Sequence, residues 1–251
     1  MRVFWVAAAL ALAPMGSGQT RAATIEILSA GAVEPGLLPA AEAFRRQTGH
    51  EVKVRFATAP ALRQRLGNAG ETVDVAIAPP AVLDEGAKAG RVDSTARVVV
   101  GKVGVGVAVR DGAPQPDVRT VEALKRAVLG ADSVVYNRAS TGLYLETLFQ
   151  RLGLTDQIAG KSTRYPDGAS VMEHLVKGST REIGFGAITE ILLFRDKGLK
   201  LAGPLPPEVQ NYTTYAASAV AGSANAEAAR SFVQFLGSPA GRAIFTAHGI
   251  E

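Results

Sequence analysis

The residues best suited to chemistry lie in one short loop, residues 137–142, with the sequence Asn-Arg-Ala-Ser-Thr-Gly. Residues 133–136 before it are β-branched or aromatic, which predicts a buried strand. The apolar residues after it follow the spacing of an amphipathic helix. Ser140 or Thr141 is expected to cap that helix, whose first backbone N–H groups have no intrahelical partner. Free N–H groups, hydroxyls and the Arg138 guanidinium together suit an anion. A plain helix cap with Arg138 pointing to water explains the same residues equally well.

Strands and helices alternate along the chain before this loop. Strands are predicted at residues 24–28, 51–56 and 73–78, and each is followed by a helical pattern. This order with short connections implies a parallel sheet that carries helices on its faces. The fold class is therefore α/β.

Each predicted strand ends in a turn of small residues, at residues 29–32, 58–60, 78–80 and 139–142. In open parallel sheets, ligands bind outside the carboxyl ends of the strands. Small residues let a ligand approach backbone N–H groups closely, although tight turns favour small residues for other reasons too. The turns supply most of the candidate ligand contacts: Ala30, Gly31, Ala32, Thr58, Ala59, Pro79, Arg138, Ser140, Thr141 and Gly142.

The apolar stretch at residues 98–109 contains Gly101, Gly104 and Gly106. These glycines fall inside predicted strands rather than between a strand and a helix, which argues against nucleotide binding. Glycine within a strand favours a bend or a crossing between lobes. We expect one lobe from residues 24–102 plus 215–251 and a second from residues 103–214, with a cleft that closes around a ligand.

The amino-terminal segment resembles a secretory signal peptide. Arg2 precedes an apolar run and then small residues, so residues 1–23 are excluded from the fold, with cleavage open among Gly18, Ala22 and Ala23. No other apolar run approaches the roughly 20 residues of a membrane span. The mature chain is expected to lie in a bacterial periplasm, outside the membrane and as a monomer.

Composition excludes several classes of function. Removal of Arg2 and Arg21 lowers the formal charge from +4 to about +2, and aromatic residues are sparse, so no nucleic-acid partner is expected. The chain has no cysteine and three isolated histidines, which argues against disulfides, thiol catalysis and a metal site. No cofactor is expected.

Six motifs carry a resemblance to a known family. They are residues 28–32, 56–62, 73–77, 142–144, 183–186 and 232–241. Together they resemble the molybdate-binding branch of the periplasmic solute-binding proteins of ABC importers, over nearly the whole mature chain. The resemblance implies a two-lobed type 2 periplasmic-binding fold, in which each lobe is a mixed, mainly parallel sheet flanked by helices. It implies a small anionic ligand and an ABC permease as partners.

Departures from that branch bear on the ligand. The resemblance leads us to expect serine hydroxyls after the first two strands and a tyrosine after a later one, where this chain has Ala32, the pair Thr58-Ala59 and Phe185. The added Arg138 favours a carboxylate, which arginine binds bidentately. Tyr212 and Thr214 are further candidates near the hinge, and a plain lobe-crossing strand is the alternative.

A group of enzymes on the same scaffold offers a second hypothesis. Residues 203–206 and 211–216 resemble periplasmic aconitate isomerase, which moves a proton and a double bond in a tricarboxylate. Such chemistry needs a general base, for which Glu190 and His174 are the candidates. Glu190 also suits the dipole of a helix start, and His174 suits a solvent-facing helix position. A binding protein for an importer is the first expectation, and the isomerase is the alternative.

Overall fold

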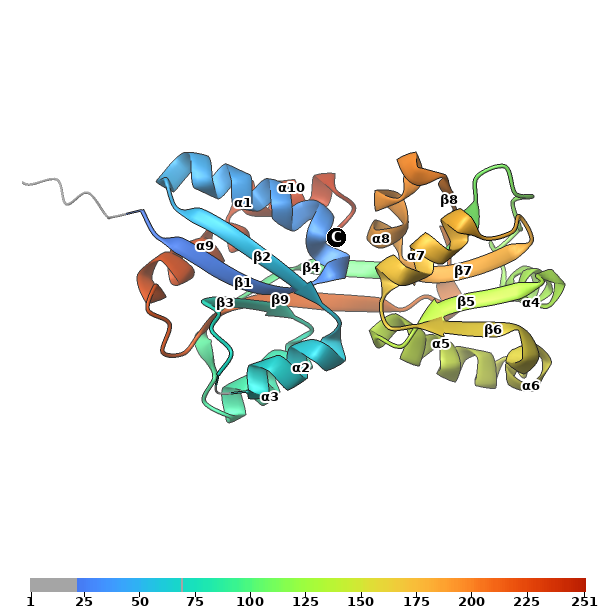
Figure 1. Ribbon diagram of the computed structural model, residues 1–251, viewed down its shortest axis with the longest axis horizontal. Coiled ribbons are helices and arrows are strands. Elements are labelled where there is room, and N and C mark those ends of the chain that lie inside the picture. The colour runs from blue at the N-terminus through green and yellow to red at the C-terminus, as the bar shows by residue number, and fades with distance from the viewer. Residues whose placement is uncertain (1–21, 69) are drawn as a thin grey trace, which may run out of the picture.

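A computed structural model describes residues 22–68 and 70–251 as two lobes joined by long strands (Figure 1). The predicted signal peptide lies almost wholly outside these residues. The strands are β1 (Thr24–Ala30), β2 (Glu51–Ala57), β3 (Val75–Ala78), β4 (Val92–Arg110), β5 (Ser133–Asn137), β6 (Ser162–Tyr165), β7 (Glu182–Ala187), β8 (Leu199–Pro204) and β9 (Tyr212–Val220). The α-helices are α1 (Glu34–Thr48), α2 (Ala59–Gly67), α3 (Pro80–Lys88), α4 (Val121–Gly130), α5 (Ser140–Arg151), α6 (Thr155–Ile158), α7 (Gly168–Lys177), α8 (Ile188–Leu193), α9 (Ala226–Gly237) and α10 (Pro239–Ala247). Short 3-10 helices are η1 (Gly31–Val33), η2 (Ala159–Lys161), η3 (Arg195–Lys197) and η4 (Pro207–Val209).

The strands follow the order β2-β1-β3-β9-β4-β7-β5-β6, and β8 pairs with the last part of β4 on the side opposite β7. Strand β1 is parallel to β2 and β3 in one lobe, and β5 is parallel to β6 and β7 in the other. The pairs made by β4 and β9 are antiparallel. The predicted α/β fold is thus confirmed, with a mixed sheet flanked by helices in each lobe.

Strands β4 and β9 carry the chain between the lobes (Figure 1). The first part of β4 pairs with β9 as far as Gly104, and its last residues pair with β7 and β8. Gly101 has a φ of 144°, and a side chain there would lie 2.6 Å from Ile250 Cγ2 and 2.8 Å from the Glu251 carbonyl oxygen. The glycines of this stretch therefore lie inside a crossing strand, and Gly101 lets the carboxyl-terminal residues lie across β4.

Buried side chains divide between the lobes. One hydrophobic cluster takes its members from β1–β3, the first part of β4, β9, α1 and the last two helices. Two further clusters use the rest of β4 together with β5, β7, α5 and α7. The predicted boundaries at residues 102/103 and 214/215 fall within β4 and β9, and we propose them as the limits of the lobes on the strength of this division.

Candidate functional site

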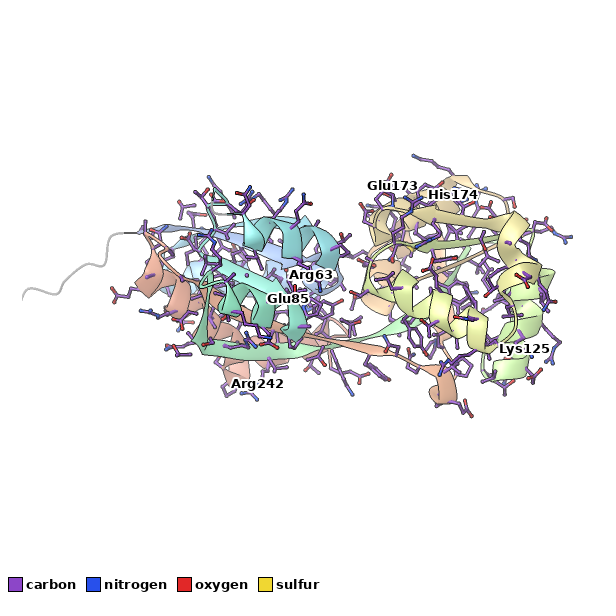
Figure 2. The ribbon with its side chains drawn as sticks, turned by 90° about the horizontal axis from the view of Figure 1, so that it is seen from below. Arg63, Glu85, Lys125, Glu173, His174 and Arg242 are labelled. Atoms are coloured by element: carbon purple, nitrogen blue, oxygen red, sulfur yellow. The ribbon has the colours of Figure 1, made fainter. Side chains whose placement is uncertain are left out.

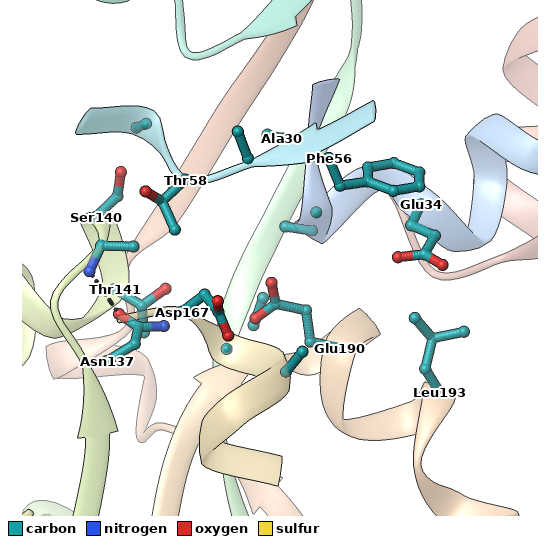
Figure 3. Close-up of a pocket in the computed structure, with 18 of the residues that line it drawn as sticks. Ala30, Glu34, Phe56, Thr58, Asn137, Ser140, Thr141, Asp167, Glu190 and Leu193 are labelled. Carbon is teal, nitrogen blue, oxygen red and sulfur yellow. Dashed lines mark hydrogen bonds between the residues drawn. The ribbon is translucent and has the colours of Figure 1, made fainter. Parts of the chain in front are cut away.

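A cavity of about 210 Å³ lies between the two lobes. The first lobe lines it with the turns after β1 and β2, and the second with the turns after β5, β6 and β7 (Figure 3). Its volume suits a ligand smaller than a typical drug-sized molecule, whose pockets span roughly 300–1,000 Å³. The cavity therefore has room for a small molecule that would contact both lobes.

The amino-terminal ends of several helices meet at this cavity. Residues of η1 and the first residues of α2, α5 and α7 are part of its lining. The first N–H groups of a helix have no intrahelical acceptor and lie at the positive end of its dipole. Thr58, Ser140 and Thr141 add hydroxyl groups. The side chains of Thr58, Ser140 and Thr141 gather at one end of the cavity in Figure 3. Together with the N–H groups at the starts of α2 and α5, they suit an anion there.

The start of α5 is held by Asn137 rather than by a helix hydroxyl. The Asn137 Oδ1 atom accepts hydrogen bonds of 3.0 Å from the backbone N–H groups of Ala139 and Gly142. Ala139 occupies the N-cap position, and its side chain makes no capping bond. The prediction that Ser140 or Thr141 caps the helix is wrong. The N-cap position falls at Ala139, one residue before Ser140, and the buried side-chain amide of Asn137 accepts the hydrogen bonds of the helix start. Both hydroxyls are thereby left to line the cavity.

Three carboxyl groups also line the cavity, those of Glu34, Asp167 and Glu190. Asp167 Oδ1 accepts a 2.8 Å hydrogen bond from the Ser170 N–H and so caps α7. Burial raises the pKa of Glu34, and the charge of Lys197 partly opposes this. The described lining residues include no lysine, arginine or histidine. In the part of the chain that the structure describes, no group of three or more acidic, histidine or cysteine side chains is placed to hold a metal ion.

Glu190 lies at the centre of this arrangement (Figure 3). It is the third residue of α8, and its carboxyl sits between Gly31 of the first lobe and Gly168 of the second, where a β-carbon would crowd or touch its oxygens. Burial, more than any other cause, raises the pKa of Glu190 from its ordinary 4.5 to about 7. The backbone N–H of Ala187 lowers the pKa of Glu190, whereas the charges of Asp167 and Glu34 raise that pKa. A carboxyl with these properties can accept or return a proton near neutral pH.

Tyr215 of β9 places a phenol in the same cavity. Burial raises the pKa of Tyr215 well above its ordinary 10, and the charge of Glu190 raises it further. The hydroxyl therefore stays protonated and serves as a hydrogen-bond donor. Tyr215 belongs to the stretch that was expected near the hinge, and it lines the cavity where its neighbours Tyr212 and Thr214 do not.

The structure brings together eight of the predicted site residues in the cavity lining: Ala30, Gly31, Ala32, Thr58, Ala59, Ser140, Thr141 and Glu190. Pro79, Gly142, Phe185, Tyr212, Thr214 and His174 lie outside that lining. Gly142 and Phe185 are buried, whereas Tyr212 is 46% exposed with Lys102 over its ring. His174 on α7 (Figure 2) hydrogen-bonds Tyr165 and Glu182 instead.

Arg138 is exposed and is not part of the cavity lining. Its backbone N–H donates to the Tyr165 carbonyl at 2.8 Å, so the loop continues the pairing of β5 with β6. The neighbouring Asn137 side chain turns into the start of α5, and successive side chains of an extended chain point to opposite sides. Arg138 therefore does not contribute to the lining of this cavity. Its role as a ligand contact stays a prediction.

Sequence reasoning missed Asp167 and Glu34. It singled out the stretches that contain Asn137 and Tyr215, residues 137–142 and 211–216, but did not name these two side chains as ligand contacts. A signal was present for Asp167, because the sequence Asp-Gly-Ala-Ser at residues 167–170 is another small-residue turn after a strand. That strand, β6, has only four residues, and none of them is fully buried, so its pattern is weak.

Sequence comparisons with known proteins identify the family of the chain. The family model described as "Bacterial extracellular solute-binding protein" matches residues 25–251. The chain is 31% identical over 223 residues to an aconitate isomerase from Pseudomonas sp, covering 86% of this chain and 82% of that protein.

Solved structures share the fold at low sequence identity. The Azotobacter vinelandii periplasmic molybdate-binding protein has a TM-score of 0.73 at 18% identity, over 90% of this chain and 98% of that one. The substrate-binding protein of an ABC transporter from Agrobacterium tumefaciens has a TM-score of 0.71 at 15% identity, over 92% and 79%. This likeness establishes the type 2 periplasmic-binding fold.

Proposed function

The chain belongs to the bacterial extracellular solute-binding protein family, and we propose that its interlobe cavity is the solute site and that the solute is a small unsaturated carboxylate, which the protein isomerises. Glu190 is the proposed general base. The aconitate isomerase relative supports a tricarboxylate as the substrate class.

The placement of Glu190 carries this proposal. An ionised carboxyl in the cavity of a protein that only binds an anion repels the ligand, and burial makes that charge costly. Glu190 is nevertheless turned into the cavity, where its oxygens lie against Gly31 and Gly168. A base whose pKa is about 7 is well matched to proton transfer near neutral pH.

The chemistry needs one proton and no other reactant. Glu190 takes a proton from the methylene carbon next to the double bond, and the electron pair of that C–H bond spreads over the allylic carbons and the attached carboxylate. Return of the proton to the far allylic carbon shifts the double bond. The helix amino termini at α2 and α5 lie where they stabilise the negative charge that develops on the carboxylate.

Proton NMR of cis- and trans-aconitate with the purified chain in D₂O tests the proposal. We expect conversion of one isomer into the other with deuterium at the exchanged carbon. Glu190→Gln should lower kcat by about 10²- to 10⁴-fold. Glu173→Gln, on α7 in the second lobe (Figure 2), is the matched control and should keep wild-type activity. A wild-type protein that leaves both isomers unchanged would overturn the proposal.

Binding and delivery to an ABC permease is the second candidate. It is supported by the likeness to the molybdate-binding protein fold and by the neutral donors of Thr58, Ser140 and Thr141. Melting curves with molybdate, tungstate and sulfate distinguish this candidate. Stabilisation by one of these oxyanions, together with inert aconitate, favours the carrier.

Under both candidates we propose that the chain acts in the periplasm after removal of residues 1–23. No helix within residues 22–68 and 70–251 has the length and apolar character needed to cross a membrane. Mass spectrometry of the protein recovered from the periplasm would give the cleavage position.

A further inference from the structure

Helix α8 begins at the boundary between the lobes, two residues before Glu190. Thr189 is fully buried, and its hydroxyl donates a 2.6 Å hydrogen bond to the carbonyl of Ala32. Thr189 follows β7 of the second lobe, whereas Ala32 belongs to η1 of the first. The bond therefore ties the start of α8 to the opposite lobe.

Apolar contacts hold the same end of α8 against the first lobe. Ala187, at the N-cap position, is part of the hydrophobic cluster of that lobe, although β7 pairs within the other. Gly249 also lies on the first-lobe side, with the Thr189 methyl group at van der Waals distance from its β-carbon position. The first turn of α8 is thus seated on η1 and on the carboxyl-terminal residues.

This seating determines where the Glu190 carboxyl lies. Thr189 and Glu190 are consecutive in one short helix, so the bond to Ala32 places the Glu190 oxygens beside Gly31, the residue before Ala32. A shift of about 1 Å in a reacting group can lower a rate by roughly 10²-fold, so the position of the Glu190 carboxyl matters for proton transfer.

We propose that Thr189 is a positioning residue for the isomerisation: its hydroxyl holds Glu190 across the lobe boundary at the place where the substrate carbon binds. This inference rests on the proposed function. Thr189 touches no substrate and acts only through α8. A purely structural role, in which the hydroxyl does no more than satisfy the buried Ala32 carbonyl, would change stability and leave catalysis in the folded protein intact.

Thr189→Val removes the donor and keeps the branched shape, and Thr189→Ser keeps the donor. We expect Thr189→Val to lower kcat by about 10- to 100-fold with KM within about threefold, and Thr189→Ser to retain most of the activity. Looser seating exposes Glu190 to water, so the acid limb of the kcat/KM profile should move to lower pH in the valine variant. Thr48→Val, which deletes a hydroxyl bonded at 2.8 Å to the Phe44 carbonyl outside the cavity, should leave kcat and the profile unchanged.

Hydrogen exchange of the segment 186–194 is measured on the same variants. Faster exchange in Thr189→Val than in the wild type, alongside the kcat loss and its rescue by serine, supports the inference. An active wild type whose Thr189→Val variant keeps its kcat and pH profile overturns the inference alone. A wild type without activity overturns the proposed function, and the inference falls with it. If the valine variant does not fold, Thr189→Ala makes the same deletion without the bulk.

Discussion

At the residue scale, the cavity opposes the ionisation of its own central carboxyl. Glu190 is surrounded by protein, faces the charges of Asp167 and Glu34, and receives one backbone N–H in compensation. Its raised pKa means that the folded state holds the Glu190 proton more tightly than the unfolded chain does. Such a residue lowers the stability of the fold at neutral pH. Reactive groups in active sites commonly lower stability in this way.

This relation predicts how stability changes in Glu190→Gln. Below pH 4.5 the Glu190 carboxyl is protonated in both states and costs nothing. As pH rises from 4.5 to about 7, the unfolded chain ionises first, so the wild type loses stability that the glutamine variant keeps. The free energy of unfolding of Glu190→Gln should therefore exceed that of the wild type by up to about 3 kcal/mol at pH 8, and by almost nothing at pH 4.

Urea unfolding at both pH values measures this difference. Because all other acidic groups are common to the two proteins, their contributions cancel in the comparison. Glu173→Gln serves as the exposed control and should match the wild type at both pH values. A difference that does not change with pH would show that Glu190 is not held in the environment described above.

At the element scale, the turn that joins β5 to α5 shows how a buried amide arranges a binding surface. Asn137 is only 2% exposed, and its single side-chain oxygen holds two N–H groups of the helix start. The first N–H groups of α5 and the hydroxyls of Ser140 and Thr141 are then free to face the cavity.

Two substitutions separate the roles of Asn137. Asn137→Ala leaves two N–H groups without their acceptor and should lower the free energy of unfolding by about 1–3 kcal/mol and weaken ligand binding. Asn137→Asp keeps the acceptor at a helix start, so its stability should stay within about 1 kcal/mol of the wild type. Its added charge faces the anion and should weaken binding about tenfold or more.

Urea unfolding and calorimetric titration with aconitate test both variants, with Asn211→Asp as a control outside the cavity. Equal affinity in the aspartate variant and the wild type would contradict the placement of the anion at α5.

The elements also show what the sequence could predict. The turns after β1, β2 and β5 were found because small residues and hydroxyls stand in the chain next to clear apolar strands. Asp167 was missed because β6 is short and half-exposed. The stretch of Tyr215 was expected near the hinge, but which of its side chains faces the cavity is a property of the tertiary fold. The orientation of Arg138 depends on a register of one residue at the end of β5, which composition does not specify. Glu190 was predicted with a helix-dipole role as the alternative, and only the packing of two lobes around it shows that its carboxyl lies half-buried between them.

At the scale of the whole molecule, β4 and β9 are continuous through both lobes, and the solute cavity opens beside them. Tyr215 lies on β9, so one of these crossing strands also contributes directly to the cavity. Hinge motion about such connections is the usual way in which a two-lobed binding protein closes on its ligand. Contacts from the two lobes should then act together, because each is complete only when the other has formed.

A double-mutant cycle across the lobes measures this coupling. Thr58 of the first lobe and Ser140 of the second line the cavity, and neither side chain caps its helix, so truncation leaves α2 and α5 intact. Thr58→Ala and Ser140→Ala should each raise the Kd for the anion by about 3- to 10-fold. The double variant should lose less affinity than the product of the two single effects, with a coupling energy of about 0.5 kcal/mol or more, because the first truncation already impairs closure of the lobes.

Calorimetric titration gives the four Kd values, and Thr147→Ala on the exposed face of α5 should match the wild type. If one of the two truncations leaves Kd unchanged, the solute rests on a single lobe. If the two effects multiply, each lobe holds the solute independently, and the joint closure proposed here is wrong.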